Sequence, residues 1–292
     1  MDQLIFLVGS GLARGSVFAV FALALVLIWR AARIVNFAQG AMAAVATYLA
    51  FAVTAATGSY WLGLAAALVG GALLGLVVER GVMRFVAHTS PLNSVIVALG
   101  LVTIMQAGLG IAFGNGYRTM NLPFSSTPIV VGGVPLLSPY NIFVLVVAAV
   151  LMIGLGLLFT RTPLGLRLRA SAFAPETSRL LGVPVSRMLT LGWVLSSAVG
   201  ALAALLVVPT ELGLNPHATD MLFVYAFTVA IVGGLDSPVG AVVGGLVVGL
   251  LLSLVTGYLG STLAPIAVLV LLVAVLLVRP GGIFSAKEAR HA

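Results

Sequence analysis

Nine long apolar runs, separated by short polar connectors, restrict the fold of this chain more than any other feature. A helix that crosses a bilayer needs roughly 20 mostly apolar residues. With 61% hydrophobic and only 7% charged residues, a soluble domain could not carry enough surface charge to stay dissolved. The sequence therefore predicts an all-α, polytopic transmembrane bundle of about eight to nine helices. The expected spans cover residues 16–29, 39–57, 60–78, 92–113, 141–160, 188–209, 221–235, 239–257 and 262–278.

The charged residues indicate an orientation. The chain has 14 Lys and Arg against 7 Asp and Glu, and tracing it from side to side places all the basic residues except Arg14 and Arg118 on one face. By the positive-inside rule this face is cytoplasmic, together with the C-terminus, and the N-terminus lies outside if the first segment spans once. Because Arg14 interrupts the first apolar stretch, the alternative is a first segment that does not span cleanly. The positive charge thus reports topology, and nucleic acid is not an expected partner. The residues on the basic face are Arg30, Arg33, Arg80, Arg84, Arg161, Arg167, Arg169, Arg179, Arg187, Arg279, Lys287 and Arg290.

A turn sequence with a charge, Gly233–Pro238, interrupts the apolar stretch between 221 and 257. We read it as two helices joined by a tight turn on the cytoplasmic side. The first helix is short, and interrupted segments in transporters can be half-helices that line a cavity. The alternative is a plain hairpin with Asp236 solvated at the interface.

The connector at 161–187 contains signals for two short helices. Thr162-Pro163 supplies an N-cap followed by proline at the first helical position, and Pro175-Glu176 begins a second helix. Gly182 is expected to end this second helix. The pattern predicts a helix on the cytoplasmic side that displays Leu180–Leu181 within a cationic rim, as a docking site for a partner. The alternative is a solvated loop that binds lipid headgroups.

The sequence lacks the motifs of the enzymes that such a chain could otherwise be. There is no G-x-x-x-x-G-K-[ST], and the single lysine is Lys287, so this chain is not expected to bind or hydrolyse ATP. Neither H-E-x-x-H nor G-x-S-x-G occurs, and the chain has no cysteine. We therefore predict a transport protein with no catalytic residues, no metal site and no cofactor of its own.

Ion-coupled carriers usually place charged groups inside their spans, and the expected spans here are nearly free of them. A uniporter or channel for a small neutral solute remains open. Four polar residues in or beside the spans could line a solute pathway, although such groups more often join neighbouring helices. They are Asn36, Gln39, Asn93 and Gln106.

Five sequence elements follow one another in a familiar order. They are Arg33–Gly40, Glu79–Arg84, Arg161–Gly165 with Leu180–Val183, Gly233–Ala241 and Val278–Phe284. They resemble the R-[IV]-[IV]-N-F-A-[HQ]-G, E-R-x-x-x-R, R-T-x-L-G with L-L-G-[IV], G-G-x-G-S-x-x-G-A and V-R-P-x-G-[IL]-F elements of LivH-type permeases. These are the inner-membrane permeases of branched-chain amino acid ATP-binding-cassette (ABC) importers, and the resemblance covers essentially the whole chain.

The resemblance implies a single permease domain over 1–292, with a cytoplasmic coupling loop at about 161–187. It implies a multi-pass protein of the bacterial inner membrane that pairs with a second permease, of which a paralogue is expected. Two cytoplasmic ATPase subunits would bind ATP and Mg²⁺, and a periplasmic binding protein would deliver the solute. The residues that it implies for ATPase coupling are Arg161, Gly165, Glu176, Leu180, Leu181 and Gly182.

The chain departs from the family pattern at a few positions. Gln39 stands where many members have histidine, Ala41 where an acidic residue is common, Phe173 where a polar residue is usual, and Asp236 where glycine is usual. Branched-chain amino acids are the expected solutes, and related permeases carry urea or short amides. A homo-oligomeric channel or uniporter is the alternative from another class, and it predicts uptake without ATP.

Overall fold

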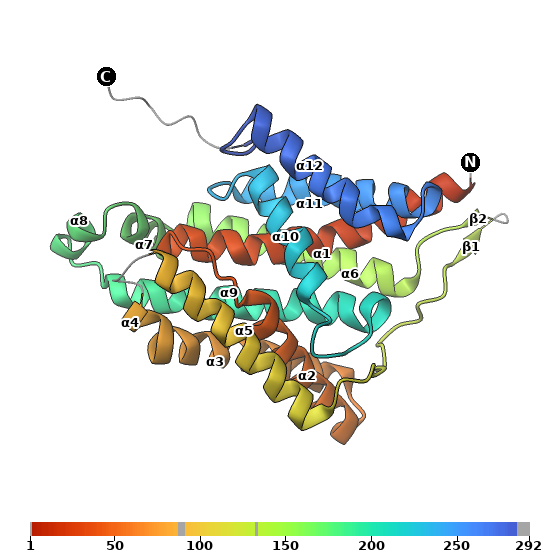
Figure 1. Cartoon of the computed structure of the whole chain (residues 1–292), viewed down its shortest axis with the longest axis horizontal. Helices are drawn as coiled ribbons and strands as arrows, with labels where there is room; N and C mark the ends of the chain where they lie inside the picture. Colours follow the sequence, from red (N-terminus) through yellow and green to blue (C-terminus); the bar gives the residue numbers. More distant parts are fainter. Residues whose placement is uncertain (1, 87–90, 132–133, 285–292) are drawn as a thin grey trace.

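The computed structural model describes residues 2–86, 91–131 and 134–284, and it confirms an all-α transmembrane bundle (Figure 1). The elements η1 and η2 are single π-helical turns, and η3 is a 3₁₀ turn. The helical elements are α1 (Asp2–Ala32), α2 (Gln39–Thr57), α3 (Tyr60–Val78), η1 (Glu79–Met83), α4 (Arg84–Val86), α5 (Pro91–Phe113), α6 (Pro139–Arg161), α7 (Pro163–Phe173), α8 (Pro175–Leu180), α9 (Val185–Val207), η2 (Val208–Leu212), α10 (Asp220–Gly233), α11 (Pro238–Tyr258), η3 (Ser261–Leu263) and α12 (Ala264–Val278).

Among the described residues, eight helices are long and apolar enough to cross a membrane, namely α1, α2, α3 with its extension, α5, α6, α9, α11 and α12 with η3. Two short strands, β1 (Val130–Val131) and β2 (Val134–Pro135), pair antiparallel in the connector before α6, and an isolated antiparallel bridge joins Arg118 to Leu214. The eight helices agree with the number of spans expected from the apolar runs.

Helix α1 forms the centre of the bundle. Its residues from Ser16 to Ile28 are all buried, and it packs against α11, α9, α10 and α6. Its 31 residues correspond to about 46 Å, longer than the hydrocarbon core of roughly 30 Å. The sequence predicted only 16–29 for this segment; the structure shows one uninterrupted helix that includes Arg14.

The close packing of α1 against α11 depends on glycine. A Cβ atom on Gly249 of α11 would lie 2.2 Å from the Cα of Gly15 in α1. A Cβ on Gly15 would in turn meet the carbonyl oxygen of Gly245 at 2.7 Å. Because neither distance leaves room for a side chain, the two backbones can touch only where both helices have glycine.

Helix α10 begins inside the bundle and is too short to span by itself. Its 14 residues correspond to about 21 Å. Thr219, directly before it, is fully buried, and its hydroxyl donates to the carbonyl of Gly40 at 2.8 Å. The structure thus agrees with a half-helix, and not with a plain hairpin, in the first part of this interrupted stretch. A tight turn follows, in which the Ser237 hydroxyl accepts from the Gly240 amide at 2.9 Å and caps α11.

Asp236 in this turn is not simply solvated. Its Oδ1 accepts from an Arg33 guanidinium nitrogen at 2.6 Å and from the Trp29 indole nitrogen at 3.2 Å. Both charged side chains are a little under half exposed. The ion pair fastens the α10–α11 turn to the segment that leaves α1.

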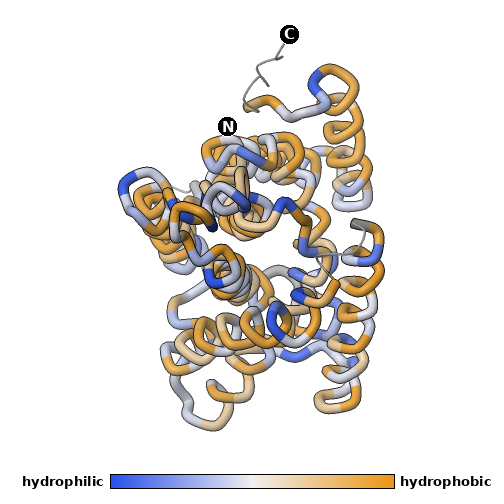
Figure 2. The backbone as a smooth tube through the Cα atoms, turned by 90° about the vertical axis from the view of Figure 1, so that its left-hand side faces the viewer, coloured by the Kyte–Doolittle hydropathy of each residue, from blue (hydrophilic) through white to orange (hydrophobic). Residues whose placement is uncertain are grey.

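The basic segments meet at one end of the bundle, which we call the basic end. It comprises the C-terminal end of α1, the extension of α3, the end of α6, helices α7 and α8, and the start of α9 (left in Figure 1). In the view from this side (Figure 2), hydrophilic connectors lie among mainly hydrophobic helices. The backbone amide of Ile283 donates a hydrogen bond to the carbonyl of Val232, so the segment after α12 lies beside the α10–α11 turn. This position agrees with helices that alternate in direction along the chain. Lys287 and Arg290 lie outside the described residues.

Candidate coupling site

The first part of the site, α7, is started by its sequence as predicted. Thr162 is extended, its hydroxyl accepts a hydrogen bond from the Gly165 amide at 3.1 Å, and Pro163 occupies the first helical position. The threonine thereby satisfies one of the amide groups that a helix start leaves open. Arg161, the last residue of α6, is exposed beside this turn.

Helix α7 packs on the bundle. Leu168 is fully buried in the main apolar core, and the helix lies against α1, α6 and α9. A Cβ on Gly165 would lie 2.3 Å from the carbonyl oxygen of Leu158 in α6, so this glycine is needed for the contact between the two helices. The structure therefore gives Gly165 a packing role inside the predicted coupling loop.

The second part, α8, is a short helix with a sharp end. Glu176 and Arg179 form an ion pair of 3.2 Å on its outer side, and Ser178 is buried on its inner side. Gly182 follows with a φ of +80°, and the amide of Val183 donates to the carbonyl of Ser178 at 2.9 Å. This is the left-handed glycine stop that the sequence predicted, because residues with a Cβ rarely adopt that conformation.

Apolar side chains project from the end of α8, from Leu181 directly after it and from the last residue of α7. Leu180 is 89% exposed and Leu181 is 79% exposed. Phe173, also at the basic end, is 83% exposed. Burying a leucine side chain is favourable by about 1.5 to 3 kcal/mol, so leaving two of them exposed on an otherwise charged surface carries a cost. A partner that covers this tip would recover that free energy.

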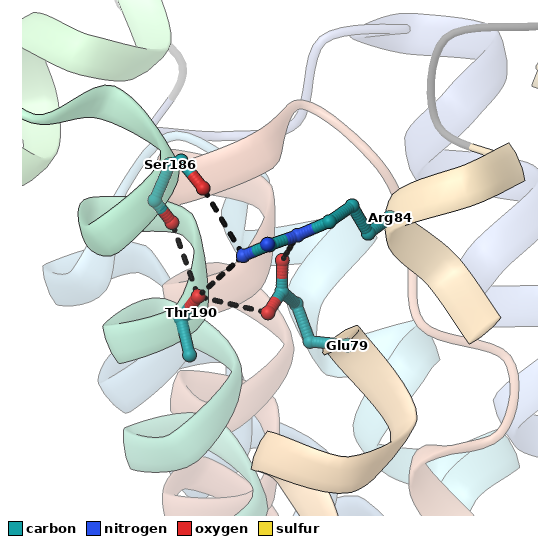
Figure 3. A network of polar contacts seen from close by, with 4 residues as sticks. All are labelled: Glu79, Arg84, Ser186 and Thr190. Carbon is teal, nitrogen blue, oxygen red and sulfur yellow. Dashed lines mark hydrogen bonds and ion pairs between the residues drawn. The ribbon is translucent and has the colours of Figure 1, made fainter. Parts of the chain in front are cut away.

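A polar network around the buried side chain of Glu79 ties the start of α9 to the extension of α3 (Figure 3). The Thr190 hydroxyl donates to Glu79 Oε2 at 2.8 Å, and Arg84 Nε donates to Glu79 Oε1 at 3.4 Å. Arg84 also donates to the Ser186 hydroxyl at 3.1 Å. Glu79 is only 4% exposed, and a carboxylate at that depth is stabilised by such partners.

The network connects α8 to the long helices. Helix α9 begins three residues after Gly182, and Ser186 and Thr190 both belong to its first two turns. Hydrogen bonds through Glu79 and Arg84 therefore join the start of α9, which directly follows α8, to the extension of α3. A cavity of about 440 Å³ lies between α8, the network and the segment after α1, and it is lined in part by Ile34, Pro175 and Trp193.

The sequence signalled only part of this network. Glu79 and Arg84 belong to one of the elements that resemble the permease family, but neither Ser186 nor Thr190 was singled out. Their spacing of four residues puts the two hydroxyls on one face at the start of an apolar helix, and this was the available signal. No group of three His, Asp or Glu side chains that could hold a metal ion occurs in the described ranges.

Two of the four predicted pathway residues join helices. Asn36 and Gln39 are both fully buried, and the Asn36 amide donates to Gln39 Oε1 at 2.9 Å. Gln39 Nε2 in turn donates to the carbonyl of Ser196 in α9 at 3.1 Å, and the Ser196 hydroxyl donates to the carbonyl of Ala24 in α1 at 2.7 Å. This chain of bonds fixes the start of α2 between α1 and α9.

The other two predicted pathway residues lie on α5. Gln106 Nε2 donates to Asp220 Oδ1 at 2.8 Å, which links α5 to the first residue of the half-helix α10. His217 Nδ1 lies 3.1 Å from the second oxygen of the same carboxylate. Asn93 is exposed near the start of α5 and far along the helix from Gln106. Of the four, Gln106 is the one that bonds to an exposed carboxylate, that of Asp220 at the start of the short helix α10.

Comparison with known proteins places these features in a family. Residues 7–279 match the family model described as the permease component of branched-chain amino acid transport systems. The high-affinity branched-chain amino acid transport permease LivH of Escherichia coli K12 is 29% identical, with 96% of this chain and 94% of that protein covered. LivH of Salmonella typhimurium and BraD of Pseudomonas aeruginosa are each 28% identical, over 96% of this chain and 94% and 95% of theirs. A solved structure of PsaBC from Streptococcus pneumoniae in complex with Fab has a TM-score of 0.49 at 14% identity, with 96% of this chain and 91% of that one covered.

The family model covers nearly all of the chain, and the relatives align with it from end to end. The eight apolar helices agree with this match. This multi-pass membrane protein belongs to the family of permease components of branched-chain amino acid transport systems.

Proposed function

We propose that this chain is a membrane subunit of an ABC importer and forms the solute pathway for branched-chain or related small amino acids. The observation that carries the proposal is the exposed tip of α8, with Leu180 and Leu181 at the basic end of a chain that has no phosphate-binding loop. A permease that cannot bind ATP needs a surface on which an ATPase can act, and this short, firmly capped helix is suited to that role.

The assembly that follows has five subunits. Two ABC ATPases, which hold ATP and Mg²⁺, dock at the basic end, and a second permease, a paralogue or a second copy of this chain, completes the pathway. A soluble binding protein delivers the solute at the opposite end. The positive-inside rule makes the basic end cytoplasmic, which puts the C-terminus in the bacterial cytoplasm and the N-terminus in the periplasm.

The proposed mechanism is alternating access without covalent chemistry. Binding of ATP brings the two ATPases together, and they move α8. Because α9 follows α8 directly and is tied to α3 through Thr190, Glu79 and Arg84, the movement reaches two long helices of the bundle. These helices tilt as rigid bodies, and the cavity between the paired permeases opens toward the periplasm.

The names of the relatives favour branched-chain amino acids over urea or short amides. The homo-oligomeric channel, the alternative from another class, leaves the exposed tip of α8 without a partner.

The test is copurification from the native membrane. Tagged wild-type protein in mild detergent is expected to bring down an ABC ATPase and a second permease, identified by mass spectrometry, with ATPase activity in the eluate. The Leu180→Asp/Leu181→Asp variant is expected to lose the ATPase. Leu166→Asp, at an exposed leucine of α7, serves as the matched control and is expected to keep it. An ATPase that stays bound to the double variant would remove α8 from the coupling role.

A further inference from the structure

A second cavity at the basic end is surrounded by arginines. Its volume is about 570 Å³, and it lies between η1 and α4 on one side and the α8–α9 connector with the first turns of α9 on the other. Since a water molecule takes up about 30 Å³ in the liquid, the cavity has room for a small charged group with its hydration. Four guanidinium groups line it, those of Arg80, Arg84, Arg179 and Arg187.

Few negative charges balance these arginines. The carboxylate of Glu79 is buried and already bonded to Arg84 and Thr190, and the exposed Glu176 faces Arg179. Within the described residues, the structure gives Arg80 and Arg187 no ion pair. Like charges around one concave, partly enclosed site raise the local positive potential, and the potential is relieved when an anion binds.

The other donors around the cavity suit an oxyanion. Val185, Ser186 and Arg187 form the first turn of α9, a helix of 23 residues, and they line the cavity. The amide groups of a first helical turn have no partner within the helix, and the helix dipole adds positive potential there. Arginine forks bind the oxygens of a phosphate group two at a time.

Exposed apolar side chains lie on the membrane-spanning part of α3, which precedes the residues that line this cavity. Leu73 and Val77 are mostly exposed and lie one turn apart. Arg80 and Arg84 follow in the π-helical turn and directly after it, and Phe85 beside Arg84 is 72% exposed. An amphiphile with a phosphate headgroup matches this order, because its head would enter the cavity while its chains lie along α3.

We propose that this cavity binds a phosphate ester, and that its occupant is the headgroup of an anionic phospholipid from the membrane leaflet at the basic end. Basic pockets between helices at a membrane surface bind such headgroups. The same chemistry would accept inorganic phosphate or a soluble phosphate ester, and the experiment separates these sources. The proposal rests on the membrane location of the chain and does not depend on its transport function.

The experiment measures lipid retention by native mass spectrometry on purified full-length protein. The protein is delipidated and then equilibrated with equal amounts of phosphatidylglycerol and phosphatidylcholine. Wild type is expected to retain phosphatidylglycerol preferentially. The Arg80→Ala/Arg187→Ala variant is expected to lose this retention by roughly tenfold or more, because each basic side chain near the surface contributes substantially to binding anionic lipid. The control Arg167→Ala/Arg279→Ala removes two exposed charges at the same end that do not line the cavity, and it is expected to retain the lipid.

Folding of each variant is checked by size-exclusion profile and thermal stability in detergent, and Arg187→Gln alone provides a milder change that is expected to weaken retention in the same direction. A parallel arm adds millimolar inorganic phosphate. If phosphate binds delipidated wild type through the same arginines and the protein shows no preference between the two lipids, the cavity binds a phosphate group but its occupant is not a phospholipid headgroup. Equal retention by the cavity and control variants would overturn the proposal. So would a cavity variant that keeps its lipid but loses a copurifying ATPase, because the cavity would then be a protein-docking surface.

Discussion

Replacing Thr190 by valine removes its hydrogen bond to Glu79, together with its weaker contacts to Arg84 and to the Ser186 carbonyl, while leaving the volume of the side chain almost unchanged. In the wild type the Thr190 hydroxyl lies 2.8 Å from Glu79 Oε2, and both residues are buried. The valine variant leaves that oxygen without a donor, and the carboxylate keeps only its longer bond of 3.4 Å to Arg84.

Hydrogen bonds to charged groups contribute about 1.5 to 3 kcal/mol. The average for interhelical side-chain bonds in a membrane is roughly 0.6 kcal/mol, because the unfolded state in the membrane also finds partners. Since Glu79 is buried, paired with Arg84 and near the end of the bundle, we expect Thr190→Val to lower the free energy of unfolding by about 1.5 to 3 kcal/mol. Thr190→Ser keeps the hydroxyl and is expected to stay close to wild type.

The assay is equilibrium unfolding of the purified protein in mixed micelles of mild detergent and dodecyl sulfate. Thr160→Val is the matched control, because the Thr160 hydroxyl is exposed and bonds only to the Gly156 carbonyl within its own helix. If Thr190→Val and Thr160→Val have the same free energy of unfolding, the network does not hold α9 to α3, and the proposed transmission from α8 loses its physical basis.

Four further substitutions test other parts of the structure. Gly249→Ala places a Cβ against α1 and is expected to destabilise the bundle by about 1 to 3 kcal/mol in the same unfolding assay. Gly154→Ala on α6 places a Cβ in open space and is expected to stabilise its helix by about 1 kcal/mol. Asp236→Asn removes a half-exposed ion pair with Arg33 and is expected to cost less than about 1 kcal/mol; a larger loss would mean that the α10–α11 turn depends on this pair for its fold. Gly182→Pro, which cannot adopt the positive φ that ends α8, is expected to leave the protein in the membrane while separating ATP hydrolysis from solute uptake in reconstituted complexes, and normal coupling would contradict the role given to this turn.

The elements that depend on local sequence could be predicted well. The apolar runs at 39–57 and 60–78 coincide with α2 and α3, because length and hydropathy alone decide whether a segment can span a bilayer. Thr162 and Gly182 began and ended their helices as expected, since a cap or a left-handed stop depends on a few neighbouring residues.

Features that depend on packing could not be predicted in the same way. Helix α1 is longer than its apolar run because its outer turns are held by contact with α11, which hydropathy does not report. Gln39 was a candidate for the pathway, and only the structure shows its amide bonded to α9. The link between Thr190 and Glu79 joins residues 111 positions apart, so it becomes visible only when α3 and α9 are placed side by side.

Solute uptake by the purified complex in proteoliposomes decides whether transport through this chain is driven by ATP. The binding protein and radiolabelled leucine are supplied on the side opposite the basic end. ATP or a non-hydrolysable analogue is supplied on the side of the basic end, where the ATPases dock. We expect uptake against a gradient with ATP and none with the analogue, and loss of this uptake in the Leu180→Asp/Leu181→Asp variant. Uptake that proceeds without ATP, and equally well in that variant, would contradict the account and identify a channel or uniporter.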